Sequence, residues 1–541
     1  MKQTGKRLLI LLFAFVALMS LPFLVPHLGF LALFGFVPLL LMQEVADEGG
    51  VKHFFWWYYA AFALWNAVTT FWVCFATVGG GVFAVLANAL QMAVIFALYR
   101  YSRRVFGDSL SLVFLAVMWI AWEKFYFSAQ ISWPWLTLGN AFAGSVGLIQ
   151  WYEYTGSLGG SLWIWLSNIW IFHFCMRWKE GCALPSRRLE LEVAVMLMLV
   201  AGPMIWSAVI DRRYEEKSDG TLEVAIIQPD FDPYQKFQRL SQRQQTSAFL
   251  NLADDALMGR PCSEASPLLV LAPETFTNDV VIGHVEEGDT WRSFKSFLEN
   301  KPGVNLLFGA STYEFSESAS APSPVARRLL DGRWLQSRNS ALIMDRTGRT
   351  EIFHKSKLVV GVELTPYPAL FTRLDERLGG VMGRCEGQER VSLLNVEASA
   401  PDGSRRSIPL GCAVCYESVY GDYCRGYVSE GAQAMTVITN DAWWGNTPGY
   451  RQHLRYSSLR AIELRRDLVR CANTGISAII DQKGRIVCRT RWWEPAVLKG
   501  KINLNDSQTA FVKYGDVTGR ACTLFFLLLC VLLFVRRVAG R

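Results

Sequence analysis

Long apolar runs dominate the first 210 residues, and much shorter runs dominate the stretch that follows. The long runs cover residues 8–25, 28–42, 54–78, 82–99, 110–127, 158–174 and 191–210. Each approaches the length of about 20 residues that a helix needs to cross a hydrocarbon core. One further apolar run covers 521–535. The pattern predicts a membrane domain over 1–215 with about seven transmembrane helices, and a C-terminal transmembrane helix with a short tail over 516–541.

The stretch between the last two spans has a different pattern. Between 222 and 504, short runs rich in β-formers alternate with turns and polar segments. The sequences DRTGRT (345–350) and DQKGR (481–485) are typical of hairpin turns, and helical patterns occupy 237–258 and 450–467. We therefore expect an α/β domain over 216–515 that is tethered to the membrane at both ends.

Basic residues gather in alternate connections between the apolar runs. Lys and Arg occur before the first run, at 100–104, at 177–188 and in the tail after 535, whereas 79–81 and 128–157 contain neither. Because basic connections stay in the cytoplasm, the N-terminus is predicted to be cytoplasmic and the α/β domain extracytoplasmic.

Composition agrees with a membrane protein and excludes one class of partner. The chain is 51% hydrophobic and contains 20 Trp. The net charge of +7 is spread out, and because no Lys/Arg-rich tract is present we expect no nucleic-acid partner. The 12 cysteines show no small-domain disulfide spacing and do not identify the redox compartment, and a disulfide among those of the α/β domain is an open alternative.

Three reactive side chains each follow a predicted strand. Cys415 ends the apolar run IPLGCAVCYE (408–417), Glu274 follows the run 268–272, and Lys355 follows the strand-like 350–353. A thiol is a good nucleophile when a nearby group takes its proton. A carboxylate, an ammonium and a thiol at three strand ends could converge at one edge of a sheet.

Other interpretations of these positions are also open. Most cysteines in apolar runs are buried and inert. Cys412 and Cys415 form a C-x-x-C pair, but a structural zinc site needs a second ligand pair and a redox pair usually opens a helix. The six histidines show no ligand spacing. We therefore expect no metal and no cofactor.

The order Glu, Lys, Cys at strand ends resembles the nitrilase superfamily (carbon–nitrogen hydrolases), and the flanking membrane helices narrow the resemblance to the apolipoprotein N-acyltransferase family. The matching segments are PWLTLGN (134–140), Gln150, IIQPD (226–230), PETF (273–276), RNSAL (338–342), HKSKLVVGVE (354–363), CYE (415–417), NDAWWG (440–445), RAIELRR (460–466) and NTGIS (473–477). The resemblance implies a multi-pass α-helical membrane bundle plus an extracytoplasmic α/β nitrilase-like domain, built as an αββα sandwich.

The resemblance also implies roles for individual residues. In a Glu-Lys-Cys triad, Cys415 would be the nucleophile, Glu274 the general base and Lys355 the stabiliser of the transition state. Supporting or substrate-binding positions would be Glu363, Tyr416, Glu417, Asn339, Phe237, Trp443 and Trp444. As alternatives, Glu363 and Glu417 could pair with the arginines of 460–466, and the two tryptophans could be core residues.

The implied reaction moves an acyl chain from a phospholipid, typically phosphatidylethanolamine, to Cys415 as a thioester. The acceptor would be the α-amine of a diacylglyceryl-cysteine at the N-terminus of an apolipoprotein, in a ping-pong scheme. The implied location is the bacterial inner membrane, with the α/β domain in the periplasm. A membrane-anchored hydrolase with the same triad, and a transporter or scaffold without catalysis, are the alternatives.

Overall fold

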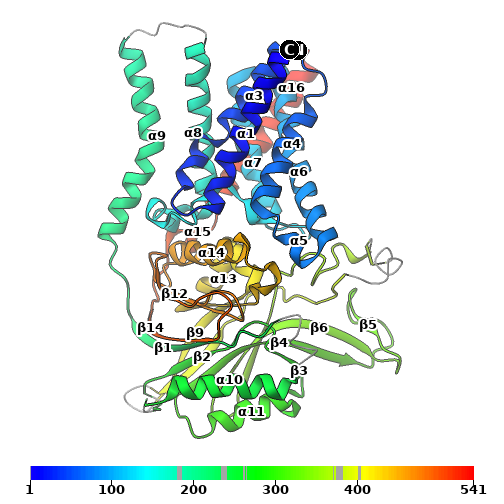
Figure 1. The fold of residues 1–541 in the computed structure, drawn as a ribbon, viewed down its shortest axis with the longest axis vertical. Helices are drawn as coiled ribbons and strands as arrows, with labels where there is room; N and C mark the ends of the chain where they lie inside the picture. The colour runs from blue at the N-terminus through cyan, green and yellow to red at the C-terminus, as the bar shows by residue number, and fades with distance from the viewer. Residues whose placement is uncertain are drawn as a thin grey trace. The chain divides into compact units, whose positions relative to one another are not determined.

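The structure, a computed structural model, describes residues 2–179, 186–232, 240–259, 262–263, 265–369, 371–372, 382–399 and 404–540. The chain forms two compact units, coloured along the chain in Figure 1. The helical unit consists of Met1–Glu215, Asn446–Leu459 and Tyr514–Arg541. The α/β unit consists of Glu216–Gly445 and Arg460–Lys513.

The helical unit confirms that the N-terminal part of the chain carries several apolar helices. Its main helices are α1 (Lys2–Leu24), α3 (Val37–Glu48), α4 (Phe55–Thr70), α6 (Val78–Phe106), α7 (Asp108–Tyr126), α8 (Tyr152–Lys179), α9 (Ser186–Arg213) and α16 (Val517–Val538). Shorter helical pieces are α2 (Ala32–Gly35) and α5 (Val73–Ala76). Among the described residues, six helices are long and apolar enough to cross a membrane. They include the C-terminal α16.

Two expected spans take a different form. The apolar run 54–78 is not one helix, because α4 ends at Thr70. The hydroxyls of Thr69 and Thr70 donate to the carbonyls of Trp65 and Asn66 at 2.6 and 2.8 Å, a local bonding mode that competes with helix propagation. The run 158–174 lies within the longer α8, which bends at Gly156, where φ is 63°.

Aromatic packing and one buried amide hold the helical unit together. The rings of Phe36 and Trp165 lie 4.3 Å apart, and those of Phe36 and Trp119 lie 5.2 Å apart. Asn168 of α8 accepts from the backbone N–H of Phe36 at 2.7 Å and donates to the carbonyl of Ala32 at 2.9 Å. This amide pairs backbone groups at the break between α2 and α3, which would otherwise be costly to bury.

The helical unit also includes part of a helix that follows in sequence from the α/β unit. Helix α14 (Pro448–Leu464) contributes its residues up to Leu459. Trp135 donates its indole N–H to Gln452 Oε1 at 2.7 Å, and the Tyr456 hydroxyl donates to the Trp135 carbonyl at 2.8 Å. Trp135, in the PWLTLGN segment, therefore anchors α14 within the helical unit.

The α/β unit contains two sheets. The first has the order β14-β1-β2-β4-β6-β5, with β3 beside β4 and β7 beside β6. Its strands are β1 (Gly220–Gln228), β2 (Leu268–Leu271), β3 (Thr277–Val281), β4 (Val304–Ser316), β5 (Arg327–Arg328), β6 (Trp334–Met344), β7 (Thr350–His354) and β14 (Ala496–Leu504). The second has the order β13-β12-β11-β10-β9-β8. Its strands are β8 (Leu394–Ser399), β9 (Arg405–Val414), β10 (Ala434–Thr439), β11 (Leu468–Ala472), β12 (Ala478–Ile480) and β13 (Ile486–Arg489).

The two sheets face each other, and helices cover their outer faces. Helices α10 (Gln242–Leu257) and α11 (Asp289–Leu298) lie along the first sheet, as Figure 1 shows. Helix α13 (Gly421–Ser429) packs on β9 of the second sheet, while β1 and β6 contact β11 and β9 across the sandwich. The predicted αββα arrangement of a nitrilase-like domain is confirmed.

A glycine in β4 brings this strand unusually close to the segment that carries Glu274. A Cβ atom at Gly309 would lie 2.6 Å from both Glu274 Cα and Thr275 N. Backbone atoms cannot yield as a side-chain tip can, so only glycine fits here without shifting the PETF segment.

We expect Gly309→Ala to lower the free energy of unfolding by about 1–3 kcal/mol, the range for overpacking a core. Chemical denaturation of the purified protein measures this loss. The matched control is Gly500→Ala, whose Cβ would meet the flexible side chain of Ile479, with the terminal methyl at 2.3 Å. Equal losses of unfolding free energy in the two variants would show that the close approach of β4 to Glu274 is not what requires glycine at position 309.

Candidate active site

Three strands of the α/β unit end at the residues singled out in the sequence. Glu274 follows β2, Lys355 follows β7, and Cys415 follows β9 and begins the 3₁₀ turn η6 (Cys415–Val419). Lys355 Nζ lies 3.0 Å from Glu274 Oε1, and the exposed fractions of the two side chains are 1% and 8%. The structure therefore joins Glu274 and Lys355 in a buried ion pair, and both charges act on Cys415.

A second carboxylate and an amide complete a closed network around this ion pair. Lys355 Nζ also donates to Glu363 Oε1 at 2.9 Å. Asn339, on β6, donates to Glu274 Oε1 and to Glu363 Oε1, each at 2.8 Å. Burial alone would lower the pKa of Lys355, but the two carboxylates outweigh it and hold the pKa well above its usual value. The ammonium therefore stays charged.

The backbone fixes Glu274 from its other side. Its Oε2 accepts from the backbone N–H of Asn440, which follows β10, at 3.1 Å. The next residue, Thr275, has φ of 47°, a region that branched residues rarely occupy. Both carboxylate oxygens of Glu274 are thus fixed. Oε2 is held by the backbone at the end of β10, and Oε1 is held by the ion pair with Lys355.

Cys415 sits at a strained turn. Its φ is 53°, and its exposed fraction is 9%. Strained backbone of this kind persists only where surrounding structure enforces it, and it clusters at functional sites. Burial raises the pKa of the thiol well above its usual value, the Glu274 carboxylate raises it further, and Lys355 opposes both. The resting thiol is therefore protonated and needs a base to become a nucleophile.

Glu417 connects the turn of Cys415 to the segment after Lys355. Its Oε2 accepts from the Val414 N–H at 2.8 Å, and its Oε1 accepts from the N–H groups of Ser356 and Lys357 at 2.6 and 3.1 Å. Burial raises the pKa of Glu417 to about 7, while these donors act in the opposite sense. Glu417 therefore positions two of the three reactive segments relative to each other.

Among the described residues, Glu363 pairs with Lys355, and Glu417 accepts from backbone N–H groups, so neither is the ion-pair partner of Arg460. Arg460 forms its ion pair with Glu463, at 2.8 Å, and donates to the carbonyls of Ser418 and Val419. It thereby binds the end of the turn that Cys415 begins.

The remaining predicted positions lie around this centre or outside the described residues. Tyr416 is buried, with its ring 5.2 Å from that of Tyr420. Trp443 and Trp444 lie in the turn η7 (Asp441–Trp444); Trp443 is 39% exposed, so it is not a core residue, and Trp444 is partly buried. Phe237 lies outside the residues that the structure describes.

The sequence interpretation missed the residues at the end of β10. Asn440 donates to Glu274, and Asp441 forms an ion pair with Arg470 at 2.6 Å, with both side chains 0% exposed. The signal was available, because NDAWWG follows an apolar run, as PETF and CYE do.

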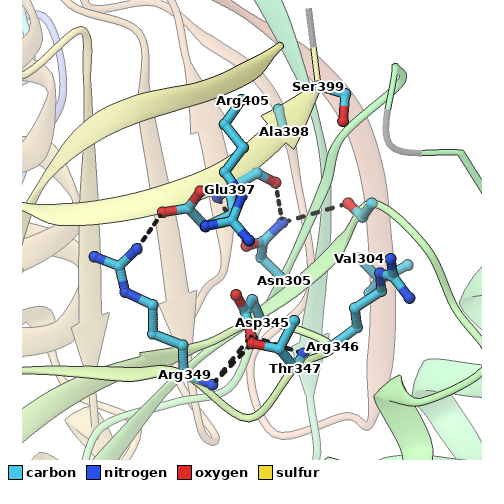
Figure 2. Close-up of a pocket in the computed structure, with 11 residues that line it drawn as sticks. Val304, Asn305, Asp345, Arg346, Thr347, Arg349, Glu397, Ala398, Ser399 and Arg405 are labelled. Carbon is cyan, nitrogen blue, oxygen red and sulfur yellow. Dashed lines mark hydrogen bonds and ion pairs between the residues drawn. The ribbon is translucent and has the colours of Figure 1, made fainter. Parts of the chain in front are cut away.

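A polar pocket lies at the opposite ends of the strands (Figure 2). It is lined by Val304 and Arg405, at the starts of β4 and β9, and by the turn that contains Asp345 and Arg349. Arg349 pairs with Glu397 at 3.1 Å, and Asp345 accepts from the Arg349 N–H at 3.1 Å. Because Glu274 and Cys415 follow the other ends of the parallel-running strands, this pocket is separate from their site.

Comparisons with known proteins agree with the two-part organisation. Residues 16–170 match the model of the apolipoprotein N-acyltransferase N-terminal domain, and residues 315–510 match that of carbon–nitrogen hydrolases. The apolipoprotein N-acyltransferase of Chlorobaculum tepidum is 28% identical over 92% of this chain and 90% of its own. That of Geobacter metallireducens is 27% identical over 96% of this chain and 94% of its own. The structural likeness to Saccharomyces cerevisiae Nit3 is weak, with a TM-score of 0.36 at 12% identity over 56% of this chain and 97% of that one.

Replacing Glu417 by Gln should destabilise the protein. The amide has one acceptor oxygen where the carboxylate has two, so its NH₂ group would face a backbone N–H. Leaving a buried donor without a partner costs about 1–3 kcal/mol, which denaturant unfolding of the purified protein measures. Glu430→Gln, at an exposed position, is the control. Equal stability of the two variants would exclude the connecting role of Glu417.

His354, which precedes Lys355, should make the protein sensitive to acid. Its Nδ1 lies 2.7 Å from Ser340 Oγ, and burial lowers the pKa of the imidazole to about 4 from 6.5, with Arg338 acting in the same sense. Between pH 6.5 and 4 the unfolded chain binds a proton that the folded protein does not, so stability falls as the pH falls. His354→Gln should lose less stability over this range than the wild type, as unfolding curves at pH 4.5 and 7 would show. Identical losses would contradict the assignment.

Proposed function

Since the chain belongs to the apolipoprotein N-acyltransferase family of the nitrilase superfamily, we propose that it moves an acyl chain from a phospholipid, through a thioester on Cys415, to an apolipoprotein. The acceptor is the α-amine of an N-terminal diacylglyceryl-cysteine. Phosphatidylethanolamine is the proposed donor, and the reaction is the last step of lipoprotein maturation.

One observation carries the proposal: Lys355 Nζ donates to Glu274 and Glu363 together, at the strand end next to Cys415. Two carboxylates and one ammonium leave one negative charge in excess, and Glu274 can hold it or accept a proton. Two of the three Lys355 N–H donors are occupied within the described part of the chain. The third is available for an oxygen that becomes negative during the reaction.

The first half-reaction forms the acyl-enzyme. Glu274 takes the thiol proton of Cys415, and the thiolate attacks the ester carbonyl of the phospholipid. The Lys355 ammonium stabilises the resulting oxyanion. The carbon–oxygen bond to glycerol then breaks, and Glu274 returns the proton to the departing alkoxide, so that a thioester and a lysophospholipid result.

The second half-reaction releases the acyl chain as an amide. The acceptor amine attacks the thioester carbonyl, and Glu274 removes a proton from the nitrogen. The carbon–sulfur bond breaks, and the proton passes to the departing thiolate, which restores Cys415 and Glu274. A hydrolase would use the same residues with water in place of the amine, so only the acceptor separates these two functions.

The proposed location is the bacterial inner membrane, with the α/β unit in the periplasm. The asymmetric distribution of Lys and Arg in the connections supports this orientation. Six apolar helices of sufficient length within the described residues support membrane insertion.

The decisive experiment incubates the purified protein with phosphatidylethanolamine alone and searches for an acyl adduct by intact-protein and peptide mass spectrometry. We expect an acyl group on Cys415, and we expect a diacylglyceryl-cysteine peptide to remove it as an N-acylated product. Glu274→Gln should slow adduct formation by about 10²- to 10⁴-fold, the usual contribution of a general base.

Cys415→Ala is the matched control and should carry no adduct. A thioester that is released only by water would favour the hydrolase. An obligatory ternary complex without an acyl-enzyme would contradict the ping-pong scheme.

A further inference from the structure

We propose that Arg470 is a positioning residue that balances the charge of Asp441 beside Cys415, so that the thiolate can form there. Its importance for acyl transfer rests on the function proposed above. Its effect on the thiol does not, because the reactivity of Cys415 can be measured without any lipid.

The Asp441–Arg470 ion pair is completely enclosed. Arg470 Nη2, on β11, lies 2.6 Å from Asp441 Oδ2 at the end of β10, and neither side chain is exposed. Space around the carboxylate is tight, since a Cβ at Gly475 would come within 2.9 Å of Asp441 Oδ2. Burying two charges is costly unless each has a good partner. The pair therefore fixes the position of both groups.

This ion pair lies close to the sulfur of Cys415. A carboxylate oxygen of Asp441 lies within 4.8 Å of Cys415 Sγ. The Thr439 hydroxyl donates its proton to Asp441 Oδ1 at 2.8 Å. The Asp441 carboxylate, held by Thr439 and Arg470, thus lies between the sulfur and a buried guanidinium.

Within the described part of the α/β unit, two opposed pairs of charges lie near the thiol. Glu274 and Lys355 act on it from one pair, and Asp441 with Arg470 forms the other. A carboxylate this close disfavours a neighbouring thiolate, and an adjacent cation cancels most of that repulsion. Arg470 therefore determines whether Asp441 merely orients Thr439 or also suppresses ionisation of Cys415.

The test measures the rate of Cys415 alkylation by iodoacetamide at one pH, with peptide mass spectrometry to separate Cys415 from the other cysteines. Below the pKa of a thiol, this rate follows the thiolate fraction, about tenfold for each pKa unit. Arg470→Met should slow alkylation by about three- to tenfold. Asp441→Asn, which keeps shape and removes charge, should accelerate it. The double variant should return towards the wild-type rate.

Opposite signs followed by recovery in the double variant would establish charge balance, because a merely structural role slows or speeds all three variants alike. Equal effects of the two single changes, or no effect, would overturn the proposal. If Arg470→Met does not fold, Asp441→Asn decides the question alone, since an unchanged or slower rate in this folded variant contradicts it. If the variants show the expected alkylation rates but the protein transfers no acyl chain, the proposed function is refuted. The role of Arg470 in balancing the charge of Asp441 would still hold.

Discussion

The buried ammonium of Lys355 is the interaction on which the candidate site depends. A charge that is removed from water is tolerated only with close partners of opposite sign, and Lys355 has two, Glu274 and Glu363. Asn339 joins the same two carboxylates through its amide. One cation therefore pairs with two anions, which holds the network together and leaves it with a net negative charge.

The network can act on the Cys415 thiol only if the thiol lies near it. The backbone conformation positions the thiol there. Cys415 leaves β9 at a positive φ, and Thr275 follows Glu274 at another. Such conformations cost about 1–3 kcal/mol each. Glu417 offsets part of this cost, because it accepts three backbone N–H groups from the two turns that flank the site. Hydrogen bonds to a buried carboxylate therefore stabilise a geometry that the chain would not adopt locally.

Sequence patterns predicted the parts of this arrangement that depend on local periodicity. Strand-like runs marked β2, β7 and β9, and the reactive side chains were expected at their ends. The expectation that these ends share one edge of one sheet was wrong, because β2 and β7 belong to the first sheet and β9 belongs to the second. The three side chains therefore come from both layers of the sandwich. The role of Glu417 could not be inferred, because two of its three backbone partners, Ser356 and Lys357, are 61 and 60 residues away in sequence. The same holds for α14: a helical pattern shows a helix, but Trp135 and Gln452 decide that most of it packs with the helical unit. Helix α4 ends at Thr70, next to two threonine hydroxyls that bond back to carbonyls four residues earlier, and hydropathy does not register such hydrogen bonds.

Transfer and hydrolysis require the same thiol, base and oxyanion donor, so the difference between them has to come from access to the thioester. Cys415, Lys355 and Glu274 are all nearly excluded from solvent, and a thioester formed there would meet little water. The partly exposed Trp443 lies in the turn that directly follows Asn440, the backbone partner of Glu274. If the proposed transfer takes place, an apolar side chain at this position would favour an acyl chain or a lipidated acceptor over water, because water gains nothing from such a surface. Under the proposed mechanism, selectivity would therefore come from the turns around the three residues rather than from the residues themselves.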